Sequence, residues 1–263
     1  MTEQTALDLA HAAMEAAPQD EAARLRFFER LADSELFLLL GAEPEGEKIQ
    51  PEVFPTEEGE FVLVFDREER LAEFASRIVP YASLSGRMIV QMLSGSGIGL
   101  GVNLDVAPSE MLVPPDALEW LRQTLEHNPE EVEAGVEEIL APAGLPEVLL
   151  TALDAKLTTA AGLAENAYLV GLHYEGGGQG HLLGFVNAQS GAEPALAQAV
   201  SEALTFSGIE AGALDVGFFA ASDEIAGKLA RVGLRFELPK PVEPLGQVPS
   251  KPGSDPDKPP RLR

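Results

Sequence analysis

The sequence contains no cysteine among its 263 residues. Disulfides, thiolate nucleophiles and cysteine-ligated zinc sites are therefore excluded. Basic residues are also few, since 18 Lys and Arg stand against 43 Asp and Glu and give a formal net charge of −25 at pH 7. A chain this acidic repels phosphate backbones and anionic lipid headgroups. We therefore expect neither nucleic acid nor a membrane surface among its partners.

Long apolar runs are missing as well. No uncharged apolar stretch reaches the roughly 18 residues that would span a bilayer. The N-terminus lacks a basic segment ahead of an apolar one and carries Glu3, Asp8 and Glu15, so we expect no signal peptide. These absences predict a cytoplasmic location. The composition that remains, 45% hydrophobic and 23% charged, is that of a globular protein with one large core or two ordinary ones.

The chain divides into three parts by composition. A polar, acidic segment around Pro129 separates a predicted N-terminal domain, residues 1–128, from a C-terminal domain, residues 129–238. Residues 239–263 are rich in Pro, Gly, Ser and Lys, which predicts a disordered tail. The tail contains a loose P-x-x-P spacing at 256–259, a pattern that such a composition produces readily by chance.

The N-terminal part predicts alternating helices and strands. Residues 61–65 form a continuous β-branched and aromatic run, typical of a strand buried on both faces. Asp66 stands where the N-cap of the following helix belongs, with Glu69 three residues on. The glycines of residues 95–101 lack the third Rossmann glycine and a Walker lysine, so they predict a turn into a strand whose glycines allow close packing.

The C-terminal part mixes a hairpin with strand–helix units. Two strands, at 167–174 and 181–187, flank a glycine-rich turn, and a later helix is predicted to begin at the N-cap Ser222. This mixture predicts an α+β fold with two mixed-sheet domains and flanking helices, rather than one doubly wound parallel sheet.

Two stretches carry a family resemblance. Residues 61–74 (FVLVFDREERLAEF) and 99–120 (GLGVNLDVAPSEMLVPPDALEW) resemble the N-terminal domain of the SseB family, the enhanced serine sensitivity proteins. Segments at 136–141, 166–174 and 215–238 resemble that family's C-terminal domain. The resemblance implies a cytoplasmic, two-domain bacterial protein linked to serine sensitivity by phenotype, and it carries no catalytic residue over. Family members usually have an Asn-Pro pair late in the N-terminal domain, whereas Asn103 is followed here by Leu104.

Histidines are the best candidates for metal ligands. His173 and His181 flank the glycine-rich turn, and direct pairing across the hairpin would bring their Cβ atoms to about 5 Å. With Glu175 they would form a site of two imidazoles and one carboxylate. The alternative is two half-exposed histidines at a hairpin mouth. His11 and His127 are predicted to lie at the surface.

Trp120 is the only tryptophan and lies off the leucine stripe of its predicted helix. This position favours the seam between the domains or a surface for a protein partner. A second buried helix face is the alternative. Met88 and Met92 share a helical face and are predicted to be core residues.

The sequence lacks the motifs of common enzymes. It has no Gly-x-Ser-x-Gly elbow, and its adjacent carboxylates, such as Glu68 and Glu69, belong to solvated faces that do not separate pKa values. We expect a non-catalytic binding or regulatory protein without a cofactor, acting on a protein partner or a small metabolite; self-association is left open. The alternative is an enzyme whose site gathers dispersed carboxylates with His173 or His181, assisted by a metal.

Overall fold

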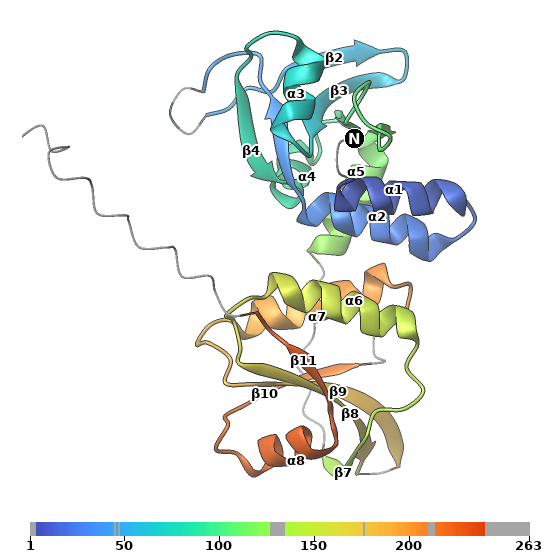
Figure 1. The fold of residues 1–263 in the computed structure, drawn as a ribbon, viewed down its shortest axis with the longest axis vertical. Coiled ribbons are helices and arrows are strands. Elements are labelled where there is room, and N and C mark those ends of the chain that lie inside the picture. Colours follow the sequence, from blue (N-terminus) through green and yellow to red (C-terminus); the bar gives the residue numbers. More distant parts are fainter. Residues whose placement is uncertain are drawn as a thin grey trace, which may run out of the picture.

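The computed structural model describes residues 4–44, 46, 48–126, 135–175, 177–209 and 214–239. Within them the chain forms two mixed sheets, each with its own helices, which confirms the predicted α+β class with two sheet domains (Figure 1). The predicted boundary at 128/129, His127 and the predicted tail beyond Pro239 lie outside the described residues.

The N-terminal domain is built on a six-stranded sheet. Its elements are α1 (Ala6–Ala16), α2 (Glu21–Asp33), β1 (Glu35–Leu39), β2 (Val53–Thr56), β3 (Gly59–Phe65), α3 (Glu68–Ala75), β4 (Tyr81–Ser85), α4 (Gly86–Leu93), β5 (Gly99–Val102), β6 (Met111–Val113) and α5 (Pro115–Leu125). The strand order is β4-β1-β3-β5-β6, with β2 also paired to β3. Strands β3 and β5 are parallel, and the other pairs are antiparallel.

The C-terminal domain is built on a five-stranded sheet. Its elements are β7 (Val136–Leu140), α6 (Glu147–Thr159), β8 (Asn166–Tyr174), β9 (Gly178–Val186), α7 (Glu193–Phe206), β10 (Asp215–Phe219), α8 (Glu224–Val232) and β11 (Leu234–Glu237). The order is β10-β9-β8-β11, with β7 paired to β8. Only β10 runs parallel to its neighbour β9.

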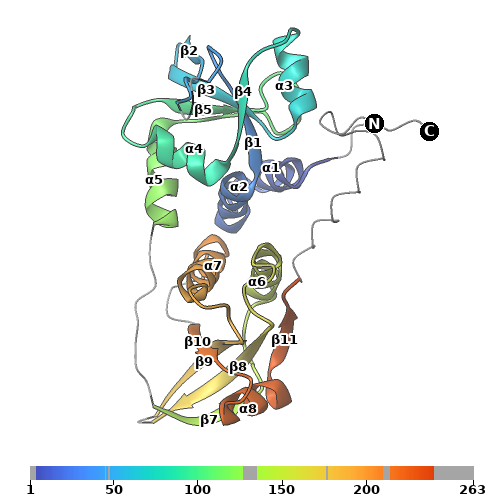
Figure 2. The ribbon, with the colours of Figure 1, turned by 90° about the vertical axis from the view of Figure 1, so that its left-hand side faces the viewer.

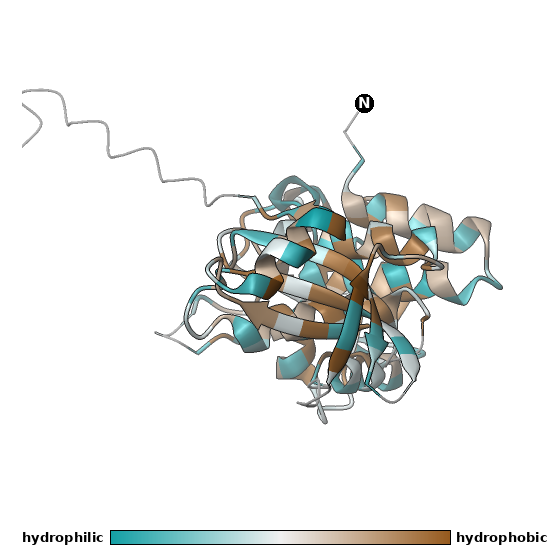
Figure 3. Ribbon diagram, turned by 90° about the horizontal axis from the view of Figure 1, so that it is seen from below, coloured by the Kyte–Doolittle hydropathy of each residue, from teal (hydrophilic) through white to brown (hydrophobic). Residues whose placement is uncertain are grey.

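Helices cover both faces of each sheet, with more than one helix on one face and a single helix on the other. In the N-terminal domain α1, α2, α4 and α5 pack on one face and α3 on the other. In the C-terminal domain α6 and α7 cover one face, while the single helix α8 packs on the other. Figure 3 views the protein from below and shows hydrophobic residues along much of the C-terminal strands. The apolar side chains of the helices and strands thus pack into one of these hydrophobic cores.

The domains meet through helices. Figure 2 shows α1 and α2 beneath the N-terminal sheet, facing α6 and α7 above the C-terminal sheet. Phe206, the last residue of α7, is 2% exposed and packs into the hydrophobic core of the N-terminal domain. The helices that cover the two sheets therefore also build the contact between them.

Two local predictions about helix starts are wrong. The N-cap of α3 is Arg67 rather than Asp66, whose carboxylate pairs with Arg70 instead. The N-cap of α8 is Asp223 rather than Ser222. The ion pair explains the first difference, because a carboxylate held by a guanidinium is not directed at the backbone N–H groups of the helix end.

The glycine-rich segment before β5 behaves as predicted. Gly95 and Gly97 have φ values of +69° and +74°, so they form the turn. A Cβ on Gly99 would lie 2.4 Å from the Phe61 ring, which means that this strand glycine permits close packing. The prediction that Met88 and Met92 are core residues is wrong, since they are 53% and 37% exposed.

Candidate functional site

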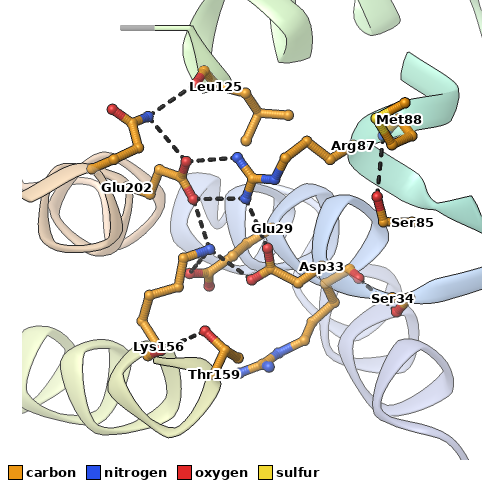
Figure 4. A network of polar contacts seen from close by, with 12 residues as sticks. Glu29, Asp33, Ser34, Ser85, Arg87, Met88, Leu125, Lys156, Thr159 and Glu202 are labelled. Carbon is orange, nitrogen blue, oxygen red and sulfur yellow. Dashed lines mark hydrogen bonds and ion pairs between the residues drawn. The ribbon is translucent and has the colours of Figure 1, made fainter. Parts of the chain in front are cut away.

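Five charged side chains meet at the contact between the domains (Figure 4). They are Glu29 and Asp33 of α2, Arg87 of α4, Lys156 of α6 and Glu202 of α7. The N-terminal domain contributes two carboxylates and one cation, and the C-terminal domain contributes one of each. We call these five residues the interdomain ion network.

Each cation in the interdomain ion network bridges the two domains. Arg87 makes a two-bonded contact with Glu202, at 2.7 Å to Oε1 and 2.9 Å to Oε2, and a third bond of 3.0 Å to Asp33 Oδ1. Lys156 Nζ lies 2.6 Å from Asp33 Oδ2 and 2.8 Å from Glu202 Oε2. Bidentate guanidinium–carboxylate pairs fix direction as well as distance. The network therefore specifies how the helices of the two domains face each other.

The network carries one more negative than positive charge. Burial by itself raises the pKa of Glu202, but the bonds from Arg87 and Lys156 outweigh it and hold that pKa at about 2. Glu29 is less well compensated, because its nearest cation, Lys156 Nζ, is 3.7 Å from its Oε1. Burial consequently raises the pKa of Glu29 despite the opposing effect of Lys156. Glu29 is the carboxylate that the network compensates least.

A glycine places Arg87 in the network. Helix α4 begins at Gly86, whose N–H donates to the Ser34 carbonyl oxygen at 2.9 Å. A Cβ on Gly86 would lie 1.8 Å from the Leu31 carbonyl oxygen, so no larger residue fits without a shift of backbone. This close approach of α4 to the end of α2 brings Arg87 beside Asp33.

A second polar cluster is buried inside the N-terminal domain. Arg70 donates to both carboxylate oxygens of Asp8, at 3.0 and 2.6 Å, and to Asp66 Oδ1 at 2.7 Å. The Thr5 hydroxyl donates to the other oxygen of Asp66 at 2.6 Å. Asp8 also closes the capping box of α1 with Thr5. The start of α1 is thus bonded to α3, although the two lie far apart in the sequence.

Asn103 extends this cluster. It is fully buried, has a φ of +48°, and accepts a hydrogen bond from the Asp66 N–H at 3.0 Å. Its amide group donates to the Ser109 hydroxyl at 2.9 Å, and that hydroxyl donates to Asp8 at 2.5 Å. Burial raises the pKa of Asp8, but the bonds from Arg70 and Ser109 outweigh it and hold that pKa well below its usual range. The turn after β5 keeps its polar anchor although Leu104, rather than proline, follows Asn103.

His173 and His181 do not pair directly across the hairpin, so the condition for a shared metal site is not met. In the β8–β9 register His173 lies opposite Gln179, and His181 lies opposite Gly171. His173 Nδ1 is 3.5 Å from Glu138 Oε2, whereas His181 Nε2 is 2.9 Å from the Ala143 carbonyl oxygen. The two rings therefore have separate polar neighbours.

The third proposed ligand, Glu175, donates its backbone N–H to the Gly135 carbonyl oxygen at 2.9 Å. Among the residues that the structure describes, no three or more His, Asp or Glu side chains gather at a spacing that could hold a metal ion. Trp120 is 39% exposed, and its ring lies edge-on to Phe28 with centroids 5.4 Å apart. A role for Trp120 at the seam or on a partner surface stays a prediction.

Sequence reasoning missed the residues of both clusters. Lys156 of α6 and Glu202 of α7 are almost fully buried, among the leucines and alanines of their helices. A lone charge on the apolar side of a helix is the signal that could have found them, since buried charges need partners. Which partners they have depends on a domain arrangement that spacing alone does not give.

The fold and its clusters define a two-domain α+β protein whose buried charges pair with one another within and between the domains. Residues 9–120 match the family model described as SseB protein N-terminal domain. This part of the chain is therefore similar to the SseB N-terminal domain, which confirms the resemblance seen at 61–74 and 99–120. The resemblance of the second half to the family's C-terminal domain stays a prediction.

Neither the curated proteins nor the solved structures include a match to this chain. In the described part of the chain, every helix is too short or too polar to cross a membrane.

Proposed function

We propose that this protein is a non-catalytic binding or regulatory protein of the cytoplasm, connected with serine sensitivity through its SseB resemblance. The supporting observation is that the charged groups of both clusters pair with one another. Asp8 and Glu202 have lowered pKa values and are ionised at neutral pH, whereas acid–base catalysis works best with a group whose pKa lies near the operating pH. Glu29 has a raised pKa but is sealed in the domain contact, where it is 5% exposed.

The interdomain ion network supports a regulatory role. Arg87 and Lys156 each hold a carboxylate of the other domain, so a displacement of α2 or α4 by a ligand changes the contact with α6 and α7. Such coupling requires that the ligand favours one of two arrangements by its contacts. A protein partner or a small metabolite can supply that preference. The net charge of −25 disfavours nucleic acid and anionic membranes as partners.

The test is to separate binding from turnover. The full chain is incubated with a mixture of amino acids, amines, organic acids and nucleotides and passed over a gel-filtration column, and both the retained and the free compounds are analysed by NMR. In parallel, the tagged chain is used to capture proteins from the cytoplasm of its native cell. We expect stoichiometric retention of an unchanged compound or stoichiometric capture of a partner. Consumption of a compound, or neither retention nor capture, would refute the proposal.

A further inference from the structure

The prediction that His11 lies at the surface is wrong. This residue of α1 is only 8% exposed. Its ring lies edge-on to Phe27 of α2, with centroids 5.6 Å apart. Among the described residues no side-chain hydrogen bond involves its imidazole, and neither ring nitrogen is among the fully buried side-chain atoms that lack a partner. This mostly buried ring therefore has no hydrogen-bond partner within the described part of the protein.

His11 also lines a pocket. It has a volume of about 420 Å³ and is lined by six residues: His11, Ala12, Glu15, Pro108, Glu110 and Met111. Small-molecule sites commonly occupy about 300 to 1,000 Å³ and combine apolar walls with a few polar groups. Pro108 and Met111 supply the apolar wall here, and His11 with the two glutamates supplies the polar groups. A buried, unpartnered imidazole that lines such a pocket points to a ligand donor that is absent from the protein itself.

The charges of the lining decide the class of ligand. The lining contains two carboxylates and no Lys or Arg. Glu110 accepts one hydrogen bond, from the Asp105 N–H at 3.0 Å, which leaves its second oxygen available. Ammonium and guanidinium groups donate to carboxylates and to a neutral imidazole nitrogen, and their bonds to carboxylates are strong because they are charge-assisted.

A bare metal ion fits this pocket less well. Metal sites need several ligands within about 2.0 to 2.6 Å of one ion. In the part of the chain that the structure describes, no three His, Asp or Glu groups converge in that way. An organic cation can span groups that are further apart and place its carbon chain against Met111. We propose that the pocket formed by His11, Glu15 and Glu110 binds a small organic cation, such as a primary amine or diamine; this ligand class rests on the proposed binding function.

The pocket is connected to the domain contact through helix α2. His11 touches Phe27, and Phe27 precedes Glu29 of the interdomain ion network by two residues on the same helix. Asp8, three residues before His11 on α1, is held by Arg70 of the N-terminal cluster. A ligand that changes the His11 ring position therefore acts on α2 directly, and the domain contact is the element that responds.

The test uses 1,4-diaminobutane as the probe, with succinate as a dianion of the same chain length and Mg²⁺ as a simple cation. Binding to the full chain is measured by calorimetry, and the His11 ring signals are followed by NMR of histidine-labelled protein. The double variant Glu15→Gln, Glu110→Gln removes the proposed contacts. The double variant Glu57→Gln, Glu58→Gln makes the same change of net charge at the exposed β2–β3 turn and serves as the matched control.

We expect saturable binding of the diamine to the native chain, with a shift of the His11 signals. Affinity should fall at least about tenfold in the pocket variant, since two charge-assisted bonds are lost, and change less than about twofold in the control. Equal losses in both variants, displacement of the diamine by equal Mg²⁺, or no saturable binding would overturn the pocket assignment. Retention of a different, unchanged compound would leave the binding function standing without this pocket. Consumption of a bound amine would instead refute the non-catalytic function.

Discussion

Lys156 Nζ of the C-terminal domain lies 2.6 Å from Asp33 Oδ2 of the N-terminal domain. The Lys156 side chain is 5% exposed, so its ammonium group has exchanged water for carboxylates that belong mostly to another domain. A buried charge is stable only with such partners, because its desolvation costs several kcal/mol, on the order of the whole stability of many domains. The relative placement of the domains is therefore a condition for burying Lys156 at all.

Replacing Lys156 by methionine should destabilise the protein strongly. The variant Lys156→Met removes the ammonium group that lies among Asp33, Glu29 and Glu202, and we expect a loss of about 3–5 kcal/mol. Urea unfolding of the full chain measures it. The control is Lys228→Met, which removes a 3.0 Å pair with Glu224 on the exposed side of α8 and should leave stability unchanged. Similar losses in both variants would contradict the importance of burial.

Replacing Glu29 by glutamine should remove the loss of folding stability that arises when its buried carboxyl group ionises at higher pH. Burial raises the pKa of Glu29 above its ordinary value of 4.5. The charged groups that act on it are Lys156, Asp33, Arg30 and Glu202. A raised pKa means that the folded state holds this proton more tightly than the unfolded chain does. Ionisation therefore costs stability as the pH rises above 4.5, and the full penalty is present above the folded-state pKa.

The free energy of unfolding of Glu29→Gln, relative to the native chain, should thus increase as the pH rises above 4.5. Urea unfolding at several pH values measures the difference. Glu21→Gln, at an exposed position of the same helix, is the matched control. A pH-independent difference for Glu29→Gln would show that its carboxyl is not perturbed.

Adding one methyl group at Gly86 should disturb the domain contact. Gly86→Ala places a Cβ 1.8 Å from the Leu31 carbonyl oxygen, so α4 must move away from α2 and take Arg87 with it. We expect a loss of about 2–4 kcal/mol, as for other overpacking changes that shift the backbone. Gly227→Ala in α8 is the matched control, because nothing lies within 4 Å of its Cβ. That change should stabilise the chain by about 0.5–1 kcal/mol through helix propensity. Equal effects of the two changes would contradict the close approach.

Asn103 allows backbone strain to be separated from hydrogen bonding. Both Asn103→Gly and Asn103→Ala remove the bonds to Asp66 and Ser109, and each should destabilise the N-terminal domain by about 1–3 kcal/mol. Alanine should cost about 1 kcal/mol more than glycine, because the φ of +48° at this position is strained for a residue with a Cβ. Thermal unfolding compares the variants. Equal stabilities would mean that the turn relaxes to an ordinary φ.

Local sequence patterns predicted helices and strands well where a single local signal, such as a run of β-branched residues, is strong. The buried strand expected at 61–65 and the two hairpin strands expected at 167–174 and 181–187 all appear, because apolar and β-branched residues act over neighbouring positions. Strands β4 and β6 were missed, since they are short and only partly apolar. Asp66 was assigned to a helix cap because the sequence shows its neighbours along the chain but not Arg70 as an ion-pair partner.

The candidate site was less predictable than the fold. Its residues come from helices that are separated by up to 173 positions, from Glu29 to Glu202. His11 shows the same limit, because its helical context says nothing of Phe27 or of the pocket lined by Glu110. Such contacts depend on long-range packing rather than on local propensity.

The amino-acid sequence by itself determined the absence of thiol chemistry, the strong negative charge, the α+β class and the resemblance of its first half to SseB proteins. Tertiary structure alone decided which charges are buried and which partners they have. The physical reason is that propensity and periodicity act between neighbours in the sequence, whereas a charge leaves water only where the folded helices of both domains supply its counter-charges.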